Sequence, residues 1–218
     1  MKATVRHKRG AKAWLLLLVV LILNAGCGGK STEEYSEESV NGNGRGKLCV
    51  YLYGDFSESK AKMICKELKN YFPEVELMEG RLALPEEGYV PNRNRYRGTA
   101  LLNDLKKYRN GNVVLGLTDK VICTSNEISS TFGIMGVSYL NSGLCVSSSI
   151  IPKSGKKQTD ENFIKLTLHE LGHAYGLPHC PDQKCYMVDA EHRMKFPHTT
   201  GFCEKCSAYL KSAGVTPD

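Results

Sequence analysis

Apolar positions in the first half of the chain from residue 47 onward follow two different periods. The run "LCVYLY" (48–53) is rich in apolar and aromatic residues and predicts a strand, as does the shorter "EVELM" (74–78). Between them, Ser57 can cap a helix, and Pro73 ends the periodic run. The apolar residues of this run return every three or four positions, at Ala61, Ile64, Cys65, Leu68 and Phe72. The pattern therefore predicts strand, helix, strand.

The second half continues this alternation after a proline-containing loop over 81–98. Leu101, Leu102, Leu105 and Tyr108 predict another amphipathic helix, closed by Asn110-Gly111. Strands are predicted for "NVVLGLT" (112–118), "FGIMGVSYL" (132–140) and "LCVSSSI" (144–150), the last two joined by Asn-Ser-Gly. Asp160 is expected to cap a longer helix through residue 176, and a short helix is expected near 203–214. This order predicts an α/β fold built on a mixed sheet.

The first 46 residues have a different composition from the rest of the chain. A basic stretch leads into "AWLLLLVVLILNAG" (13–26), which is typical of a secretory signal, and Ala25-Gly26-Cys27 resembles a bacterial lipoprotein box in which the cysteine is lipidated. An uncleaved anchor or plain secretion are the alternatives, and all three place the domain outside the cytoplasm. Residues 28–46 predict a flexible linker. We therefore expect a signal peptide over 1–27, a linker over 28–46 and one domain over 47–218.

The net charge of +6 does not indicate an acidic partner. Five basic residues lie in the first twelve, before any acidic residue. Without these five, 24 of the 29 Lys and Arg residues remain against 23 Asp and Glu. A nearly neutral domain gives no electrostatic basis for binding nucleic acid, and no such partner is expected.

The segment "HELGH" (169–173) carries two histidines at helical spacing. Residues four apart share one face of a helix, so His169 and His173 present two imidazoles to one point, as a tetrahedral zinc ion requires. Glu170 lies beside the first ligand, where its carboxylate can act as general base on a water activated by zinc. The spacing therefore indicates peptide hydrolysis assisted by a metal ion.

A third ligand is predicted just beyond the helix. Gly176 can take the left-handed conformation that ends a helix, and Pro178 prevents the helix from resuming. The chain then turns so that His179 can reach the same ion. Three histidines leave one position open, which predicts a catalytic zinc site.

Four cysteines follow the third histidine, at Cys180, Cys185, Cys203 and Cys206. Their spacing, including a CxxC pair, predicts a structural zinc site with four thiolates, and two disulfides are the alternative. Four further cysteines are scattered through the domain, at Cys49, Cys65, Cys123 and Cys145. They can form disulfides or remain buried thiols, and the sequence does not decide between these states.

"HELGHAYGLPHCPDQKCYM" with "CEKC" further on resembles the archaemetzincins, a branch of the metzincin metallopeptidases. The resemblance implies a zincin-like mixed sheet with an active-site helix and a small C-terminal subdomain stapled by zinc. It implies a catalytic zinc on the three histidines, Glu170 as base, and a second zinc on the four cysteines. Met187 matches the methionine that lies beneath the catalytic site in metzincins.

These observations predict a zinc-dependent peptidase with two zinc ions per chain, acting on peptide or protein substrates as a monomer anchored to a membrane through Cys27. The alternative is a zinc-binding lipoprotein that keeps the fold without catalysis. Glu170 argues against this alternative, because a site that only binds metal has no need of a base. His179 and Cys180 are neighbours that serve different ions, so we expect the structural site to hold the third catalytic ligand in place.

Overall fold

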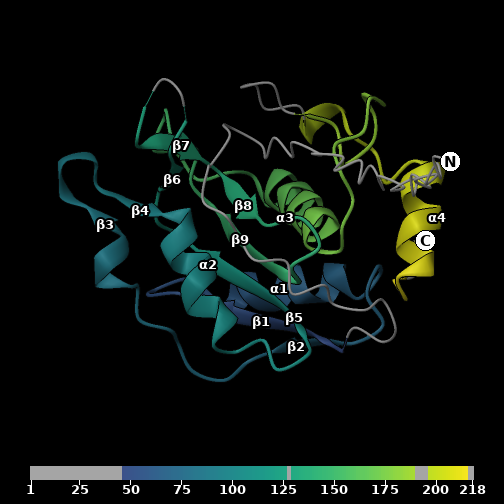
Figure 1. Ribbon diagram of the computed structural model, residues 1–218, viewed down its shortest axis with the longest axis horizontal. Helices are drawn as coiled ribbons and strands as arrows, with labels where there is room; N and C mark the ends of the chain where they lie inside the picture. The colour runs from purple at the N-terminus through teal and green to yellow at the C-terminus, as the bar shows by residue number, and fades with distance from the viewer. Residues whose placement is uncertain (1–45, 127–128, 190–195, 216–218) are drawn as a thin grey trace, which may run out of the picture.

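The computed structural model of the chain describes residues 46–126, 129–189 and 196–215. A five-stranded sheet in the order β2-β1-β5-β9-β8 forms its centre (Figure 1). Four strands are parallel, and β8 alone runs antiparallel to its neighbour β9. The bounds of the strands are β1 Leu48–Leu52, β2 Val75–Leu77, β5 Val113–Thr118, β8 Gly136–Ser138 and β9 Leu144–Ser148. The mixed α/β sheet expected from the sequence is confirmed.

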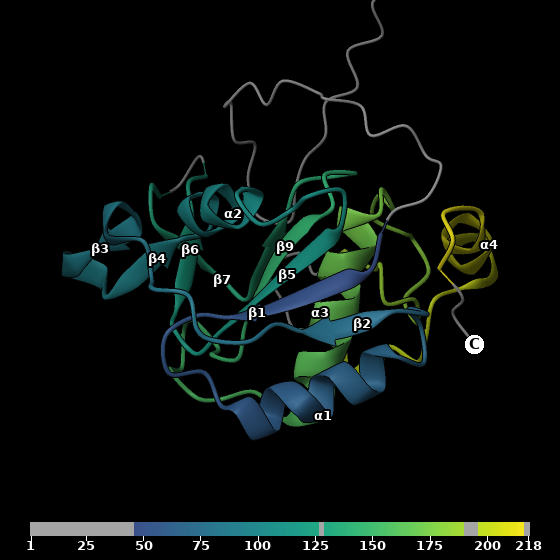
Figure 2. The same ribbon diagram turned by 90° about the horizontal axis from the view of Figure 1, so that it is seen from below.

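Helices cover both faces of this sheet, as Figure 2 shows. Helices α1 (Glu58–Leu68) and α3 (Asp160–Ala174) lie on one face, and α2 (Gly98–Lys106) lies on the other. Each face of the sheet has its own hydrophobic core. The strands supply apolar side chains to both cores, because successive side chains of a strand point to opposite faces. Leu115 packs on the α1 and α3 side, for example, while its neighbour Val114 packs on the α2 side.

The longest helix, α3, begins at Asp160, one residue earlier than expected from Asp160 as the N-cap. Thr159 has an extended backbone, and its hydroxyl accepts a hydrogen bond from the amide of Asn162 at 3.3 Å. Asp160 is instead the first helical residue, where its negative charge favours the positive end of the helix dipole. The expectation that Asp160 is the cap is therefore wrong by one position, since both neighbours have side chains that can cap.

A second, smaller sheet lies beside the first and was not predicted. It has the order β3-β4-β6-β7, with bounds β3 Tyr89–Val90, β4 Arg95–Arg97, β6 Ile122–Thr124 and β7 Phe132–Ile134. The expected strand over 132–140 divides at Met135, so that β7 belongs to the small sheet and β8 to the large one. The expected loop over 81–98 contains β3 and β4, together with two short 3-10 turns at Glu86–Gly88 and Pro91–Arg93.

The C-terminal part of the chain returns over the end of α3. It contains a 3-10 turn at Phe196–His198 and helix α4 (Glu204–Ser212), whose Leu210 joins the core shared with α1 and α3. Within the described ranges, no helix is long and apolar enough to cross a membrane. The expected signal peptide with Cys27, and all of the expected linker except Gly46, lie outside these ranges.

Candidate metal centres

Two imidazoles from α3 converge on one point. His169 and His173 follow each other by one helical turn, and their Nε2 atoms are 3.1 Å apart. His169 is almost fully buried, with 2% of its surface exposed. A tetrahedral ion with bonds of about 2.0–2.1 Å separates its ligand atoms by about 3.3 Å, which is close to this spacing.

Backbone carbonyls fix which nitrogen of each ring carries hydrogen. His169 donates from Nδ1 to the carbonyl of Tyr186 at 2.7 Å, and His173 donates from Nδ1 to the carbonyl of Leu177 at 2.7 Å. A carbonyl oxygen only accepts, so Nδ1 holds the proton and Nε2 keeps its lone pair. Burial lowers the pKa of His169 to about 4 and that of His173 well below its ordinary value. Both rings are therefore neutral at pH 7, the form that binds metal.

The third histidine reaches this point through a turn that only glycine adopts easily. Gly176 has φ +105°, and its amide and that of Leu177 bond back to His173 and Gly172 as the helix ends. The chain reverses there, and the side-chain nitrogens of His169, His173 and His179 all lie within 4.8 Å of one another. Oδ2 of Asp189 lies 3.5 Å from Nδ1 of His179.

This arrangement fits a cation. Two neutral rings whose Nδ1 atoms both donate elsewhere turn two Nε2 lone pairs toward each other at 3.1 Å, which is repulsive unless a positive ion lies between them. A divalent ion would accept both lone pairs and that of His179. The donor set of three imidazoles suits zinc among the common metals.

Glu170 is buried beside the three histidines and is held by the neighbouring edge strand. Ser138 of β8 donates a hydrogen bond from Oγ to Oε2 of Glu170 at 2.8 Å. A Cβ atom at Gly136 would overlap the Glu170 carboxylate, so the strand approaches this carboxylate closely because residue 136 lacks a side chain. Burial raises the pKa of Glu170 to about 8, and the bond from Ser138 opposes this rise. A buried carboxyl group is thus fixed next to His169 in the chain by its contacts with β8.

The second group joins two segments that are separated in the sequence. The sulfur atoms of Cys180, Cys185, Cys203 and Cys206 lie within 4.8 Å of one another. The sulfur of Cys185 also accepts hydrogen bonds from the amides of Met187 and Cys203, both at 3.4 Å. None of the eight cysteines within the described residues forms a disulfide, including the four scattered ones, which are buried thiols.

The two groups share the chain segment 180–188. The Tyr186 carbonyl that orients His169 lies one residue beyond Cys185, and the amide of Cys180 bonds to the carbonyl of Met187 at 2.8 Å. Met187 is fully buried beneath α3. Its sulfur can pack directly against the helix because Gly172, one residue before His173, has no side chain. The segment that carries Cys180 and Cys185 therefore also carries a hydrogen-bond partner and a packing partner of the histidine group.

Three contacts at this site involve residues that were not singled out from the sequence: Ser138, Asp189 and the carbonyl of Tyr186. Ser138 and Glu170 are 32 positions apart, and no local pattern connects them. The only available signal for Asp189 was a carboxylate two residues after Met187. His198 lies in the 3-10 turn near α3 but is not part of the histidine group, and His192 lies outside the described residues.

The mixed sheet, its buried histidine helix and the glutamate beside it define a class of protein, the metal-dependent peptidases. The profile of Peptidase family M54 matches residues 56–212, and the chain belongs to this family. It is a zinc-dependent peptidase that acts on peptide or protein substrates. The catalytic prediction is thereby supported over the non-catalytic alternative.

Several relatives from archaea match most of the domain. Archaemetzincin from Methanopyrus kandleri is 28% identical over 170 residues, which span 76% of this chain and 95% of the relative. The crystal structure of archaemetzincin from this organism superimposes with a TM-score of 0.62 at 26% identity, covering 77% of this chain and 94% of that one. A zinc-dependent peptidase from Methanocorpusculum labreanum shares the fold, with a TM-score of 0.60 at 19% identity over 75% of this chain and 99% of that one.

Proposed function

We propose that His169, His173 and His179 hold the catalytic zinc of this peptidase and that Glu170 moves the proton during hydrolysis. The observation that carries this assignment is the pair of Nδ1–H bonds to backbone carbonyls, which leaves both Nε2 lone pairs directed at one point. When bound there, zinc polarises the peptide carbonyl and activates water for attack.

Glu170 is placed to act as general base and then as general acid. Its carboxylate lies against Gly136 of the edge strand, beside the histidines but held by Ser138 rather than by a histidine. It takes a proton from the attacking water and delivers it to the leaving amine nitrogen. Burial raises the pKa of Glu170 to about 8 and so favours its protonated form. A divalent ion on the adjacent histidines would oppose this shift by stabilising the carboxylate, the form that acts as base.

A second zinc is proposed on the four cysteines, where it would be structural. Four thiolates close a tetrahedral site and leave no position for substrate. Burial raises the pKa of the Cys185 thiol to about 11, so a thiolate there needs a positive ion, and a zinc ion supplies that charge. Amide hydrogen bonds to the Cys185 sulfur from Met187 and Cys203 stabilise the same negative charge.

The purified chain is expected to contain two zinc ions. Inductively coupled plasma mass spectrometry on protein of known concentration measures this number. The double variant H169A/H173A should retain one ion, because it removes only the histidine group. A parent protein with only one zinc ion would contradict the four-thiolate site. A parent protein without any zinc would contradict the hydrolytic mechanism.

Replacing Asp189 with Asn is expected to lower zinc affinity at the histidine site by about tenfold, the lower end of the range for groups that orient a metal ligand. Asp189 lies 3.5 Å from Nδ1 of His179, and its charge favours the proton on that nitrogen, which leaves the other nitrogen for the metal. Titration against a chromophoric chelator measures the affinity. Asp55→Asn, in an exposed turn after β1, is the matched control. Equal affinity in both variants would contradict this role of Asp189.

We also propose that the peptidase is a monomer exported from the cytoplasm and anchored through a lipid on Cys27. The basic and apolar leader and Ala25-Gly26-Cys27 support this assignment, with residues 28–46 as the linker to a domain over 47–218. Metabolic labelling with radioactive palmitate should mark the expressed chain, and Cys27→Ser should abolish the label. A labelled Cys27→Ser variant or an unlabelled parent would contradict the anchor.

A further inference from the structure

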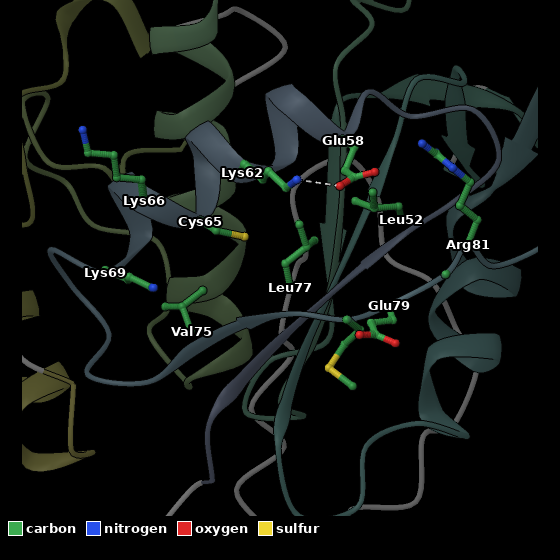
Figure 3. A pocket seen from close by; sticks show the side chains of 12 residues that line it. Leu52, Glu58, Lys62, Cys65, Lys66, Lys69, Val75, Leu77, Glu79 and Arg81 are labelled. Carbon is green, nitrogen blue, oxygen red and sulfur yellow. Dashed lines mark ion pairs between the residues drawn. The ribbon is translucent and has the colours of Figure 1, made fainter.

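The five-stranded sheet ends in two edge strands, β2 and β8, whose surroundings differ. A groove of about 770 Å³ lies beside β2, and Figure 3 shows acidic and basic side chains on both of its walls: Glu58 and Lys62 on α1, and Glu79 and Arg81 after β2. Such a mixture favours no charged ligand. The edge strand β8 instead lies against Glu170, the proposed base, so β8 is the edge that can influence hydrolysis.

Two residues of β8 contact the carboxylate of Glu170 from the same face of the strand. Ser138 donates a hydrogen bond from Oγ to Oε2 at 2.8 Å. Gly136 lies beneath Oε1, and a Cβ atom at this position would overlap that oxygen. Residues two apart on a strand share a face, so the carboxylate lies along the strand, over Gly136 and beside Ser138.

The two oxygens of this carboxylate have different partners. Oε2 accepts the hydrogen bond from Ser138, whereas Oε1 accepts none from the described residues. A hydrogen bond to Oε2 stabilises negative charge on that oxygen and makes it less basic than Oε1. The arrangement therefore favours Oε1 as the oxygen that takes a proton from water.

The bond from Ser138 also limits the orientations that the Glu170 side chain can adopt. A glutamate has several rotatable bonds, and fixing them requires a specific contact. Proton transfer needs donor and acceptor atoms within about 2.6–3.2 Å, and a misplacement of about 1 Å can cost about 10²-fold in rate. Once Oε1 carries the proton, Oε2 can still accept the hydrogen of Ser138. The same bond can thus hold the side chain before and after the transfer.

A second hydroxyl group on this face of the sheet provides a comparison. Ser147 of β9 pairs directly with Gly136, and its side chain is fully buried. Its Oγ has no hydrogen-bond partner among the described residues, so it does not hold the carboxylate. Ser138 and Ser147 therefore place the same functional group on the same face, but only Ser138 is bonded to Glu170.

We propose that Ser138 is a positioning residue of the peptidase reaction, which binds Oε2 of Glu170 and reserves Oε1 for the transferred proton. This role rests on the proposed function of Glu170 as the base. An O–H bond of the attacking water breaks as the Oε1–H bond forms. The Oε1–H bond then breaks as the leaving amine nitrogen takes the proton. Ser138 acts on both steps only through Glu170.

Steady-state hydrolysis of one quenched fluorescent peptide tests this role. Ser138→Ala should lower kcat about tenfold, because Gly136 still leaves the carboxylate its place but nothing fixes its orientation. KM and zinc content should stay unchanged. Ser138→Thr keeps the hydroxyl at a half-buried strand position, where a β-branched side chain fits, and should restore kcat to within about twofold of the parent. Ser147→Ala is the matched control and should keep the parental kcat.

A double-mutant cycle shows whether Ser138 acts through Glu170. In the Glu170→Gln background, adding Ser138→Ala should change kcat by less than about twofold, because the carboxylate that Ser138 positions is already gone. A tenfold loss in both backgrounds would overturn the proposal. It would also be overturned by an equal loss in Ser147→Ala, by loss of zinc from Ser138→Ala, or by a threonine variant that does not restore kcat.

The same variants distinguish this proposal from the function on which it rests. Parental kcat in Ser138→Ala, together with a large loss in Glu170→Gln, would remove the role of Ser138 and leave Glu170 as the base. Parental kcat in Glu170→Gln would contradict the base itself, and the role of Ser138 with it.

Discussion

Glu170→Gln is expected to lower kcat for peptide hydrolysis by about 10³-fold, within the range measured for loss of general acid–base catalysis. Glutamine keeps the shape of the side chain and can still accept the hydrogen bond from Ser138, but it cannot take a proton from water. The zinc content should stay unchanged, because the carboxylate is not among the three proposed ligands. Hydrolysis of a quenched fluorescent peptide library, together with metal analysis, measures both quantities.

Glu161→Gln is the matched control for this experiment. Glu161 lies on the same helix, is exposed and pairs with Lys165 at 2.7 Å, so its loss removes a carboxylate without touching the site. An exposed pair contributes about 1 kcal/mol at most, and activity should remain at the parental level. If Glu170→Gln hydrolysed peptides as fast as the control, Glu170 would not be the proton carrier, and another group would have to fill that role.

The parts of the site that could be predicted from the sequence depend on local geometry. His169 and His173 share a face wherever a helix forms, and Gly176 marks where the helix ends, because few other residues adopt its φ of +105°. The four cysteines were grouped by spacing alone, and their sulfurs do come within 4.8 Å of one another. These features need no knowledge of the rest of the fold.

The remaining features depend on contacts between distant segments, which no local pattern encodes. The apolar run around Met135 reads as one strand, and only pairing with β6 on one side and β9 on the other divides it between two sheets. That division places Gly136 and Ser138 against Glu170. The choice of Thr159 over Asp160 as helix cap is likewise decided by backbone angles, since either side chain can cap.

Cys185→Ser is expected to weaken zinc binding at the histidine site by 10- to 100-fold, about the cost of losing a group that orients a metal ligand. Cys185 is not one of the three histidine ligands, so the effect must travel through the chain. The serine hydroxyl is a poor zinc ligand, so the variant loses one of the four ligands of the cysteine site. Without this ligand, the segment 180–188 should no longer be held in place. That segment carries the Tyr186 carbonyl bonded to His169, and it carries Met187 beneath α3.

Zinc titration against a chelator measures this coupling, with Cys65→Ser as control. Cys65 is also buried, with 7% of its surface exposed, but it lies on α1 away from both metal groups. Any general cost of burying a hydroxyl should therefore appear in both variants, and the loss of zinc affinity only in Cys185→Ser. Far-ultraviolet circular dichroism checks that both variants keep the fold.

A second pair of variants separates the loss of a ligand from the loss of a thiol. Cys203 is half-buried at the start of α4, so Cys203→His has room for a ring and keeps four ligands as Cys₃His, a common structural zinc site. It should retain parental affinity at the histidine site, whereas Cys203→Ser should behave like Cys185→Ser. Parental affinity in both serine variants would show that the two centres are independent and that the cysteine site does not hold His179 in place.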